Sequence, residues 1–97
     1  MQQYESMTPL QTVDRALQIL SWFSPSQPEV TVARVARGLG VSRSVASRLL
    51  AALEARQFVA QDPETGRFRL GVRNLDLGAL FLQSHRLVSA ATPYLEQ

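Results

Sequence analysis

The stretch RGLGVSRSVASRLL, residues 37 to 50, limits what this chain can fold into more than any other part of it. Two glycines stand between a short run with helical spacing and a serine-led run that ends in a leucine pair. Such a stretch is either a glycine-rich loop that cradles a nucleotide phosphate or the turn between two helices of a DNA-reading unit. The spacing of the glycines and the segments around them distinguish these two possibilities.

The glycine spacing argues against a phosphate-binding loop. Gly38 and Gly40 match the first two glycines of G-x-G-x-x-G, but Arg43 occupies the third position and no strand-like run comes before them. The pattern G-x-x-x-x-G-K-[ST] does not fit either. The glycines therefore predict a turn, in which Gly38 or Gly40 takes the left-handed conformation that ends a helix.

A helix is predicted on each side of this turn. Thr31 is a suitable N-cap for a short helix over residues 32–39, and Val30 stands at the offset from Val35 that a hydrophobic staple requires. After the turn, Ser42 is the predicted cap of a longer helix that extends to about Arg56.

The longer helix has two different faces when it is projected at about 100° per residue. We expect one face to be buried in the core, and its residues are Val45, Ala46, Leu49, Leu50, Ala52 and Leu53. The other face carries short or hydrogen-bonding side chains, and its residues are Arg43, Ser44, Ser47, Arg48 and Ala51. Because this second face has no bulky apolar group, it can lie close against a polar partner.

Upstream, the sequence predicts a flexible lead-in over residues 1–11 and a scaffold helix over residues 13–23 with Thr12 as its cap. The apolar stripe expected to face the core consists of Val13, Ala16, Leu17, Leu20 and Phe23. The following segment SPSQPE contains Pro25 and Pro28, so it cannot continue the helix and is predicted to be a loop.

Two strand-like runs follow the longer helix at residues 58–61 and 67–70, joined by DPETG. Pro63 suits the second position of a type I turn and Gly66 the left-handed position after it, which predicts a β-hairpin. Alternation gives the second strand an apolar face, formed by Phe68 and Leu70, and a basic face, formed by Arg67 and Arg69.

The last predicted element is a linker helix over residues 74–92, with Asn74 as its cap, Asp76 in its first turn and Pro93 beyond its end. It is apolar on two nearly opposite sides. One side consists of Leu77, Leu80, Phe81, Val88 and Ala91, and the other of Leu75, Ala79 and Leu82. We expect the first side to pack on its own domain and the second to form a dimer contact with another chain; the alternative is a central core helix.

Composition and charge limit the possible functions. The 97 residues suit one compact domain, no cysteine is present, and His85 is the single histidine, so we predict no metal site, no cofactor, no catalytic residues and no enzymatic activity. Residues 31–73 hold eight arginines against three acidic residues, giving +5, whereas the flanks hold two arginines against five acidic residues, giving −3. A basic centre favours an anionic partner, nucleic acid first.

No apolar run approaches the roughly 18 residues that span a bilayer, and the N-terminal segment lacks the features of a signal peptide. We therefore expect a soluble, cytoplasmic protein with no membrane partner.

Together these elements predict a mainly α protein with a small β-hairpin, namely a winged helix-turn-helix over residues 12–73 followed by a linker and dimerisation helix. In such a unit the third helix enters the major groove of double-stranded DNA and the hairpin, or wing, reaches adjoining backbone.

The candidate DNA-binding residues are Thr31, Arg34, Ser42, Arg43, Ser44, Ser47, Arg48, Arg67 and Arg69. Arg43 is placed to contact a guanine, whereas for Arg48 a packed stem with its head paired to an acid is the competing explanation. The alternative function is a winged helix that docks on another protein through the last helix.

From VDRALQIL through GVSRSVASRLLAALE, FVAQDPETGRFRLG and the LDLGALFLQ helix to ATPYLEQ, the chain resembles the N-terminal DNA-binding domain of IclR-type bacterial transcriptional regulators. The resemblance implies a homodimer that represses or activates transcription from a palindromic operator. It also implies a larger C-terminal domain that binds a small organic effector; residues 93–97 would be the start of that domain, the rest of which is missing from the chain.

Two residues depart from the pattern of that family. Gln57 stands where family members tend to have glycine, at a position that prefers a left-handed backbone. Ser47 replaces a residue that is frequently larger, so the operator sequences of relatives do not carry over to this chain.

Overall fold

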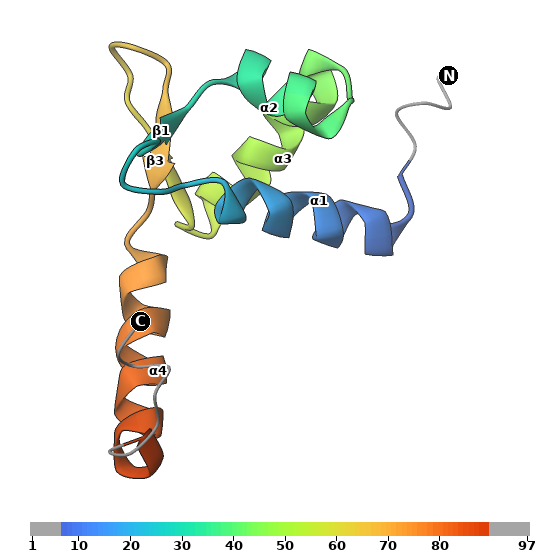
Figure 1. The fold of residues 1–97 in the computed structure, drawn as a ribbon. Helices are drawn as coiled ribbons and strands as arrows, with labels where there is room; N and C mark the ends of the chain where they lie inside the picture. Colours follow the sequence, from blue (N-terminus) through green and yellow to red (C-terminus); the bar gives the residue numbers. More distant parts are fainter. Residues whose placement is uncertain (1–6, 90–97) are drawn as a thin grey trace.

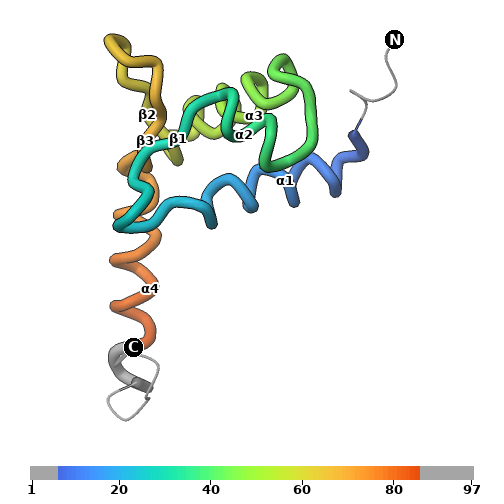
Figure 2. The backbone as a smooth tube through the Cα atoms, turned by 45° about the horizontal axis from the view of Figure 1, so that its top comes forward, coloured from blue at the N-terminus to red at the C-terminus, as the bar shows by residue number. Residues whose placement is uncertain are grey.

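The computed structural model describes residues 7–89, with side chains as far as His85. In chain order its elements are α1 (Pro9–Ser21), β1 (Glu29–Val30), α2 (Val32–Leu39), α3 (Arg43–Ala55), β2 (Val59–Gln61), β3 (Phe68–Leu70) and α4 (Arg73–Ser89). Helices α1 to α3 and the small sheet form one packed unit, from which α4 projects as a rod (Figure 1). A second view of the backbone shows the same separation of α4 from the other helices (Figure 2). The predicted architecture, mainly helical with a small β-hairpin and a linker helix, is confirmed.

Helix α3 lies at the centre of the core. Five of the six side chains predicted for its inner face are buried, namely Val45, Ala46, Leu49, Leu50 and Leu53. Ala52, the sixth, is exposed because it lies at the edge of the apolar arc. Helix α2 and helix α1 both pack on α3 from the core side. The opposite, polar side of α3 is therefore left facing solvent.

The turn between α2 and α3 forms as predicted. Thr31 caps α2, since its Oγ1 accepts a hydrogen bond from the backbone N–H of Arg34 at 3.1 Å. Gly40 has a φ of 70° and ends the helix, whereas Gly38 lies inside α2. A β-carbon on Gly38 would stand 2.6 Å from Cη2 of Trp22. One candidate glycine thus makes the turn, and the other lets the indole ring pack closely on α2.

Helix α1 begins earlier than predicted. Thr8 is its N-cap, in a reciprocal capping box with Gln11, and Pro9 is the first helical residue. The prediction of Thr12 as the cap, and of a lead-in through residue 11, was wrong because Thr8 and Gln11 satisfy the first backbone groups four residues sooner. The hydroxyl of Thr12 donates to the carbonyl of Thr8 inside the helix. Residues 1–6 of the predicted lead-in lie outside the described residues.

The apolar stripe of α1 is buried only along one edge. Ile19, which lies outside the predicted stripe, is fully buried. Within the stripe, Ala16, Leu20 and Phe23 are half-buried. Val13 and Leu17 were predicted to face the core, but they are 57% and 59% exposed. Helical spacing identifies residues that share a side of α1, whereas the position of α3 decides which edge of that side is covered.

The sheet has a third strand that the sequence did not predict. Its order is β1-β3-β2, with both pairings antiparallel. Val30 of β1 pairs with Phe68 on the core face, and Glu29 pairs with Arg69 on the other face. Strand β1 contains only two residues between a proline and a helix cap, so it exists because β3 supplies its hydrogen-bonding partners. The predicted apolar face of the hairpin is only half correct, since Leu70 is exposed.

Helices α2 and α3 end with the same backbone motif but with different residues. After α3, the N–H groups of Gln57 and Phe58 donate to the carbonyls of Glu54 and Leu53, which is the Schellman pattern. Gln57 has a φ of 68°, the left-handed conformation that Gly40 adopts after α2. Gln57 therefore adopts the left-handed backbone that favours glycine.

We expect Gln57→Gly to raise the free energy of unfolding by about 1 kcal/mol, because glycine has no β-carbon to clash in the left-handed region. Urea denaturation followed by circular dichroism measures this change as a higher midpoint with an unchanged slope. An unchanged or lower midpoint would contradict the assignment of strain to Gln57.

Helix α4 differs from its prediction at its start and in its packing. It begins at Arg73, and Asn74 does not cap it; the Asn74 side-chain amide instead donates to the carbonyls of Phe58 and Gly71, at 2.8 and 2.9 Å. Asp76 lies in the first turn as predicted and pairs with Arg73.

Neither apolar side of α4 is covered by the domain. The expectation that one side packs on the domain, and the alternative of a central core helix, were both wrong for the described side chains, because α4 leaves the packed unit as soon as it begins (Figure 1). The exposed large residues of α4 are Leu75, Leu77, Leu80, Phe81 and Leu82. The side chain of Val88, as well as Ala91 and residues 93–97, lies outside the described part of the chain.

Candidate nucleic-acid interface

The outer face of α3 is a polar surface without bulky side chains. Ser42 caps the helix, its Oγ accepting from the backbone N–H of Val45 at 3.1 Å. The next residues that point away from the core are Arg43, Ser44, Ser47, Arg48 and Ala51, and all five are exposed as predicted. Their exposure follows from the burial of Val45 and Leu49 on the opposite side, since the two sets alternate around the helix.

Arg43 stands out among these side chains. It is the first residue of α3, and its guanidinium makes no ion pair or hydrogen bond with any described residue. A guanidinium at this place carries two parallel donors, which match the O6 and N7 acceptors of guanine in the major groove. The arrangement brings Arg43 and Ser44 to the end of the helix that points at base edges in helix-turn-helix complexes.

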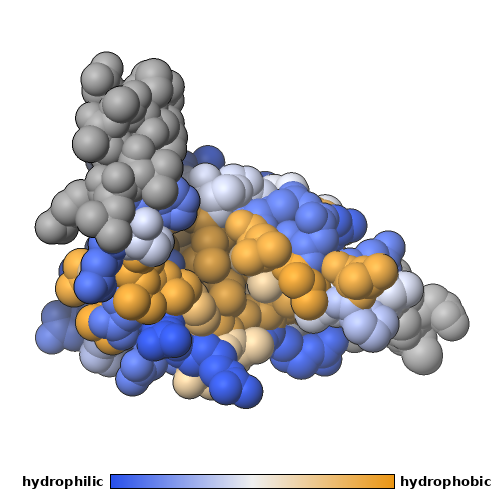
Figure 3. Space-filling model, turned by 90° about the horizontal axis from the view of Figure 1, so that it is seen from below, coloured by the Kyte–Doolittle hydropathy of each residue, from blue (hydrophilic) through white to orange (hydrophobic). Residues whose placement is uncertain are grey.

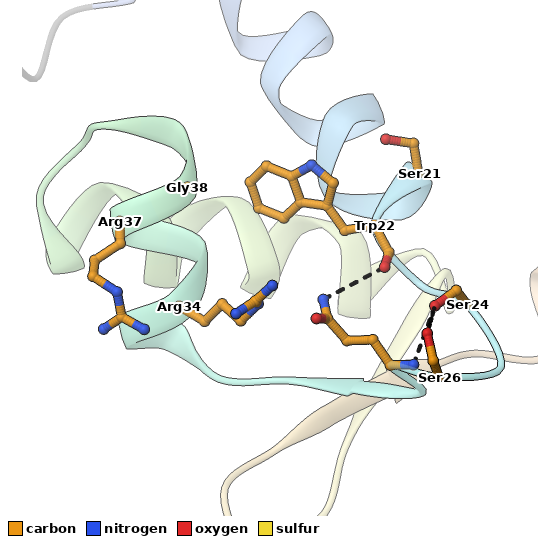
Figure 4. A pocket seen from close by; sticks show the side chains of 8 residues that line it. Ser21, Trp22, Ser24, Ser26, Arg34, Arg37 and Gly38 are labelled. Carbon is orange, nitrogen blue, oxygen red and sulfur yellow. Dashed lines mark hydrogen bonds between the residues drawn. The ribbon is translucent and has the colours of Figure 1, made fainter.

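Helix α2 adds two further arginines beside α1. Arg34 and Arg37 lie one turn apart on the outer face of α2, and both line a shallow hollow closed on its other side by Trp22 and the 24–27 loop (Figure 4). Neither guanidinium has an ion-pair partner within residues 7–85. Arg34 was predicted as a DNA-binding residue and Arg37 was not. The spacing of three residues, which places both on the polar face of a predicted helix, is the signal in the sequence that would have identified Arg37.

The wing places its two arginines next to an acid. Arg67 and Arg69 project from the face of the sheet opposite the core, as predicted. Glu29 of β1 binds both of them: its Oε2 accepts from Nη2 of Arg69 at 2.9 Å, and its Oε1 lies 3.5 Å from Nη1 of Arg67. Nothing in the local sequence pattern links Glu29 to the wing, because that pattern does not predict β1, which holds Glu29 in register with Arg69.

The turn of the wing is held by its own backbone. Gly66 has a φ of 77°, as predicted, and its N–H donates to the carbonyl of Asp62. The backbone N–H of Glu64 donates to Oδ1 of Asp62 at 2.9 Å and lowers the pKa of that carboxyl below its usual value. Asp62 is therefore ionised at neutral pH and keeps the turn ordered.

The underside of the domain carries an apolar band. Figure 3 shows hydrophobic residues gathered across this face, between the base of α4 and the far end of α1. The exposed large apolar residues of α1 are Leu10, Val13 and Leu17, which repeat at helical spacing. The predicted dimer residues Leu75 and Leu82 are 70% and 50% exposed, and Ala79 between them is exposed as well. A surface of this kind is typical of an interaction site.

The described residues do not support a catalytic histidine, a metal site or a membrane-spanning helix. His85 stacks on Phe81 at a centroid distance of 4.3 Å, and its Nδ1 lies 3.0 Å from the carbonyl of Phe81, one turn earlier in the same helix. No group of three or more histidines, cysteines and acidic residues is placed to bind a metal ion within residues 7–85. None of the helices between residues 7 and 89 combines the length and apolar character needed to cross a bilayer.

A three-helix core, a turn that leads into a helix with an exposed polar face, and a three-stranded wing define a winged helix-turn-helix, a class of DNA-binding domain. The protein-family model of the IclR helix-turn-helix domain matches residues 12–63, which is more than half of the chain. The chain therefore belongs to the IclR family, whose members are transcription regulators and not enzymes.

Individual relatives agree with this assignment. The transcriptional regulator XynR of Escherichia coli is 31% identical over 91 residues, which cover 94% of this chain and 36% of XynR. The transcriptional repressor IclR of the same organism is 31% identical over 89% of this chain and 31% of its own length. An IclR transcriptional regulator from Silicibacter matches the fold with a TM-score of 0.74 at 31% identity, over 82% of this chain and 32% of that one. The chain thus spans about a third of the length of the curated relatives it matches.

Proposed function

We propose that this domain binds double-stranded DNA sequence-specifically, with α3 in the major groove and α2 and the wing on the flanking backbone. The proposal rests mainly on Arg43, the first residue of α3. Arg43 is exposed, has no partner among the described residues and begins a helix whose outer face is polar. Ser44 and Ser47 are short enough to let that face approach base edges, and Arg48 would reach a phosphate.

The backbone contacts are assigned to the basic groups on either side of α3. Thr31 uses its hydroxyl oxygen as an acceptor for the helix cap, so its hydroxyl hydrogen is available to a phosphate. Arg34 and Arg37 present two cations beside it, and Arg67 and Arg69 present two more on the wing. Contacts of this kind carry no sequence information, but they hold the recognition helix in its register.

We further propose that the chain acts as a homodimer on a palindromic operator. The second apolar side of α4, formed by Leu75, Ala79 and Leu82, would pack against its copy in a partner chain, because the domain itself leaves these residues exposed. A two-fold axis would then place two recognition helices about one helical turn, ~34 Å, apart on the DNA, or a multiple of that distance.

Leu82→Glu is expected to convert the dimer to a monomer, since it places a charge on the proposed contact. Analytical ultracentrifugation over a range of concentrations measures the change. Gln83→Glu adds the same charge to the neighbouring exposed position of α4 and is expected to leave the dimer intact. A wild-type chain that stays monomeric at high concentration would contradict the dimer proposal.

The complete regulator is proposed to be longer than this chain. The relatives named above are about three times as long, and a further relative is named for an operon, the acetate operon repressor of Salmonella typhimurium. We propose that a C-terminal domain outside this chain binds a small organic effector and that the effector changes the DNA affinity of the domain described here.

Selection of preferred duplexes from a random pool tests DNA reading directly. We expect a two-fold symmetric sequence to emerge, and an electrophoretic shift at moderate salt to retain it in preference to unselected DNA. If no sequence is enriched, or if the selected duplex is retarded no better than random DNA, then the proposal of sequence-specific binding is wrong and a protein-docking role of the winged helix gains support.

A further inference from the structure

The wing arginines share one carboxylate that comes from outside the hairpin. Glu29 lies on β1, directly across from Arg69 in the sheet, and Arg67 lies two residues before Arg69 on the same face. The Glu29 carboxylate therefore divides its two oxygens between the two guanidiniums, at 2.9 Å from Arg69 and 3.5 Å from Arg67. The three groups together carry a net charge of +1, where the two arginines alone would carry +2.

We propose that Glu29 is an internal counter-ion that competes with DNA phosphates for Arg67 and Arg69, and thereby limits the sequence-independent part of DNA binding. The inference rests on the proposed DNA contact of the wing. A phosphate is the same kind of ligand for a guanidinium as a carboxylate, because both accept two parallel N–H donors. Each wing arginine must therefore give up part of its interaction with Glu29, or share it, when it binds the DNA backbone.

The geometry permits this exchange. Both arginine side chains are 57% exposed, whereas the Glu29 side chain is 29% exposed, so the guanidiniums are accessible to a ligand while the carboxylate lies deeper in the surface. Ion pairs with such exposed arginines are weak, and salt screens them further. The strong field of a DNA backbone can then displace them.

The other acids of the wing do not pair with these two arginines. Asp62 accepts the backbone N–H of Glu64 within the turn and attracts Arg69 through its charge, but no ion-pair contact joins Asp62 or Glu64 to Arg67 or Arg69 among the described residues. The direct contact with both guanidiniums is made by Glu29, a residue more than 30 positions away in sequence that pairing of β1 with β3 brings to the wing.

Glu29→Gln tests the proposal, because it removes the charge while preserving the size of the side chain. The probe is a fluorescein-labelled duplex of random sequence, and binding of the 97-residue chain is followed by fluorescence anisotropy across a salt series. We expect the variant to bind about three- to tenfold more tightly than the wild type near 0.1 M salt, with a salt slope steeper by about one because an additional phosphate contact forms.

Two further variants separate the specific pair from a general charge effect. Asp14→Asn raises the net charge by the same amount on α1, where the acid pairs with Arg15, and it is expected to change the affinity less than twofold. The double variant Glu29→Gln with Arg69→Ala is expected to lose most of the gain, because the guanidinium that would benefit is gone.

The outcomes are distinct. If Glu29→Gln binds no better than the wild type, or improves only as much as Asp14→Asn, Glu29 does not compete for the wing. Weaker binding by Glu29→Gln would also overturn the inference, because the carboxylate would then orient the arginines for DNA. A wild-type chain that binds no duplex at low salt would instead refute the DNA-binding proposal itself.

Discussion

Arg43→Ala is expected to weaken binding to the selected duplex by roughly 10- to 100-fold while changing the affinity for random DNA by less than about threefold. The size of the loss follows from the ~1–3 kcal/mol of discrimination that one two-pronged arginine–guanine contact provides. Such a loss is specific to the correct sequence because the contact is made to a base edge and not to the backbone. Anisotropy titrations on both duplexes at one salt concentration measure the two affinities.

The structure supplies a reason to expect the full effect at Arg43. No described residue pairs with its guanidinium, so removal of the side chain leaves no internal partner unsatisfied and does not disturb the fold. Arg56 offers a matched control, since it is an exposed arginine at the other end of the same helix. Arg56→Ala removes the same charge and should weaken both duplexes slightly and equally. An equal loss on both duplexes for Arg43→Ala would exclude Arg43 from base reading.

Gly71→Ala is expected to lower the free energy of unfolding by about 3 kcal/mol, because there is no room for a β-carbon at this position. The added atom would stand 2.3 Å from the backbone oxygen of Gln57 and 3.0 Å from the backbone nitrogen of Val59. A backbone atom cannot rotate away as a side chain can, so the corner between α3 and β2 would have to open. The urea midpoint measures the loss, which is a large part of the stability of a domain of this size.

The position of Gly71 links this stability to the interface. The N–H of Gly71 donates to the carbonyl of Phe58, and its carbonyl accepts from the side chain of Asn74. The glycine thus joins the end of β3 to the start of β2 and to the base of α4, so the variant should also weaken DNA binding through a misplaced wing. The expected result is a lower urea midpoint together with a weaker affinity for every duplex.

Gly78→Ala is the matched control for the same chemical change. Gly78 lies in the exposed part of α4, and a β-carbon there would meet nothing within 4 Å. Alanine at this place is expected to favour the helix by up to about 1 kcal/mol, because glycine is a poor helix residue. If Gly71→Ala proved as harmless as Gly78→Ala, the close approach of Gly71 to the backbone between α3 and β2 would be wrong.

Local sequence signals were reliable where one residue type performs a task within its own turn of chain. Thr31 and Ser42 cap the helices that were assigned to them, Gly40 and Gly66 take left-handed backbones, and the alternation of α3 separates a buried face from a polar one. Each of these features depends on hydrogen bonds or sterics within about five residues. They were therefore visible in the sequence.

Failures occurred where two local solutions competed or where a distant partner decided. Thr8 and Thr12 are both good caps, and the capping box with Gln11 made Thr8 the one that forms. Asn74 looked like a cap, yet its amide is used by carbonyls of the preceding corner. The burial of α1 along the edge of Ile19 depends on where α3 lies, which no spacing within α1 reveals.

By itself, the sequence determined the helix-turn-helix, the hairpin and the polar face of α3, because capping, turn chemistry and helical periodicity act over a few residues. Only the tertiary structure decided that β1 exists, that Glu29 meets Arg67 and Arg69, and that α4 stands clear of the domain. The strand and its ion pairs arise from pairing between segments far apart in the chain, whereas α4 stands clear because its large described side chains do not pack on the domain. Both depend on positions in space that local patterns do not encode.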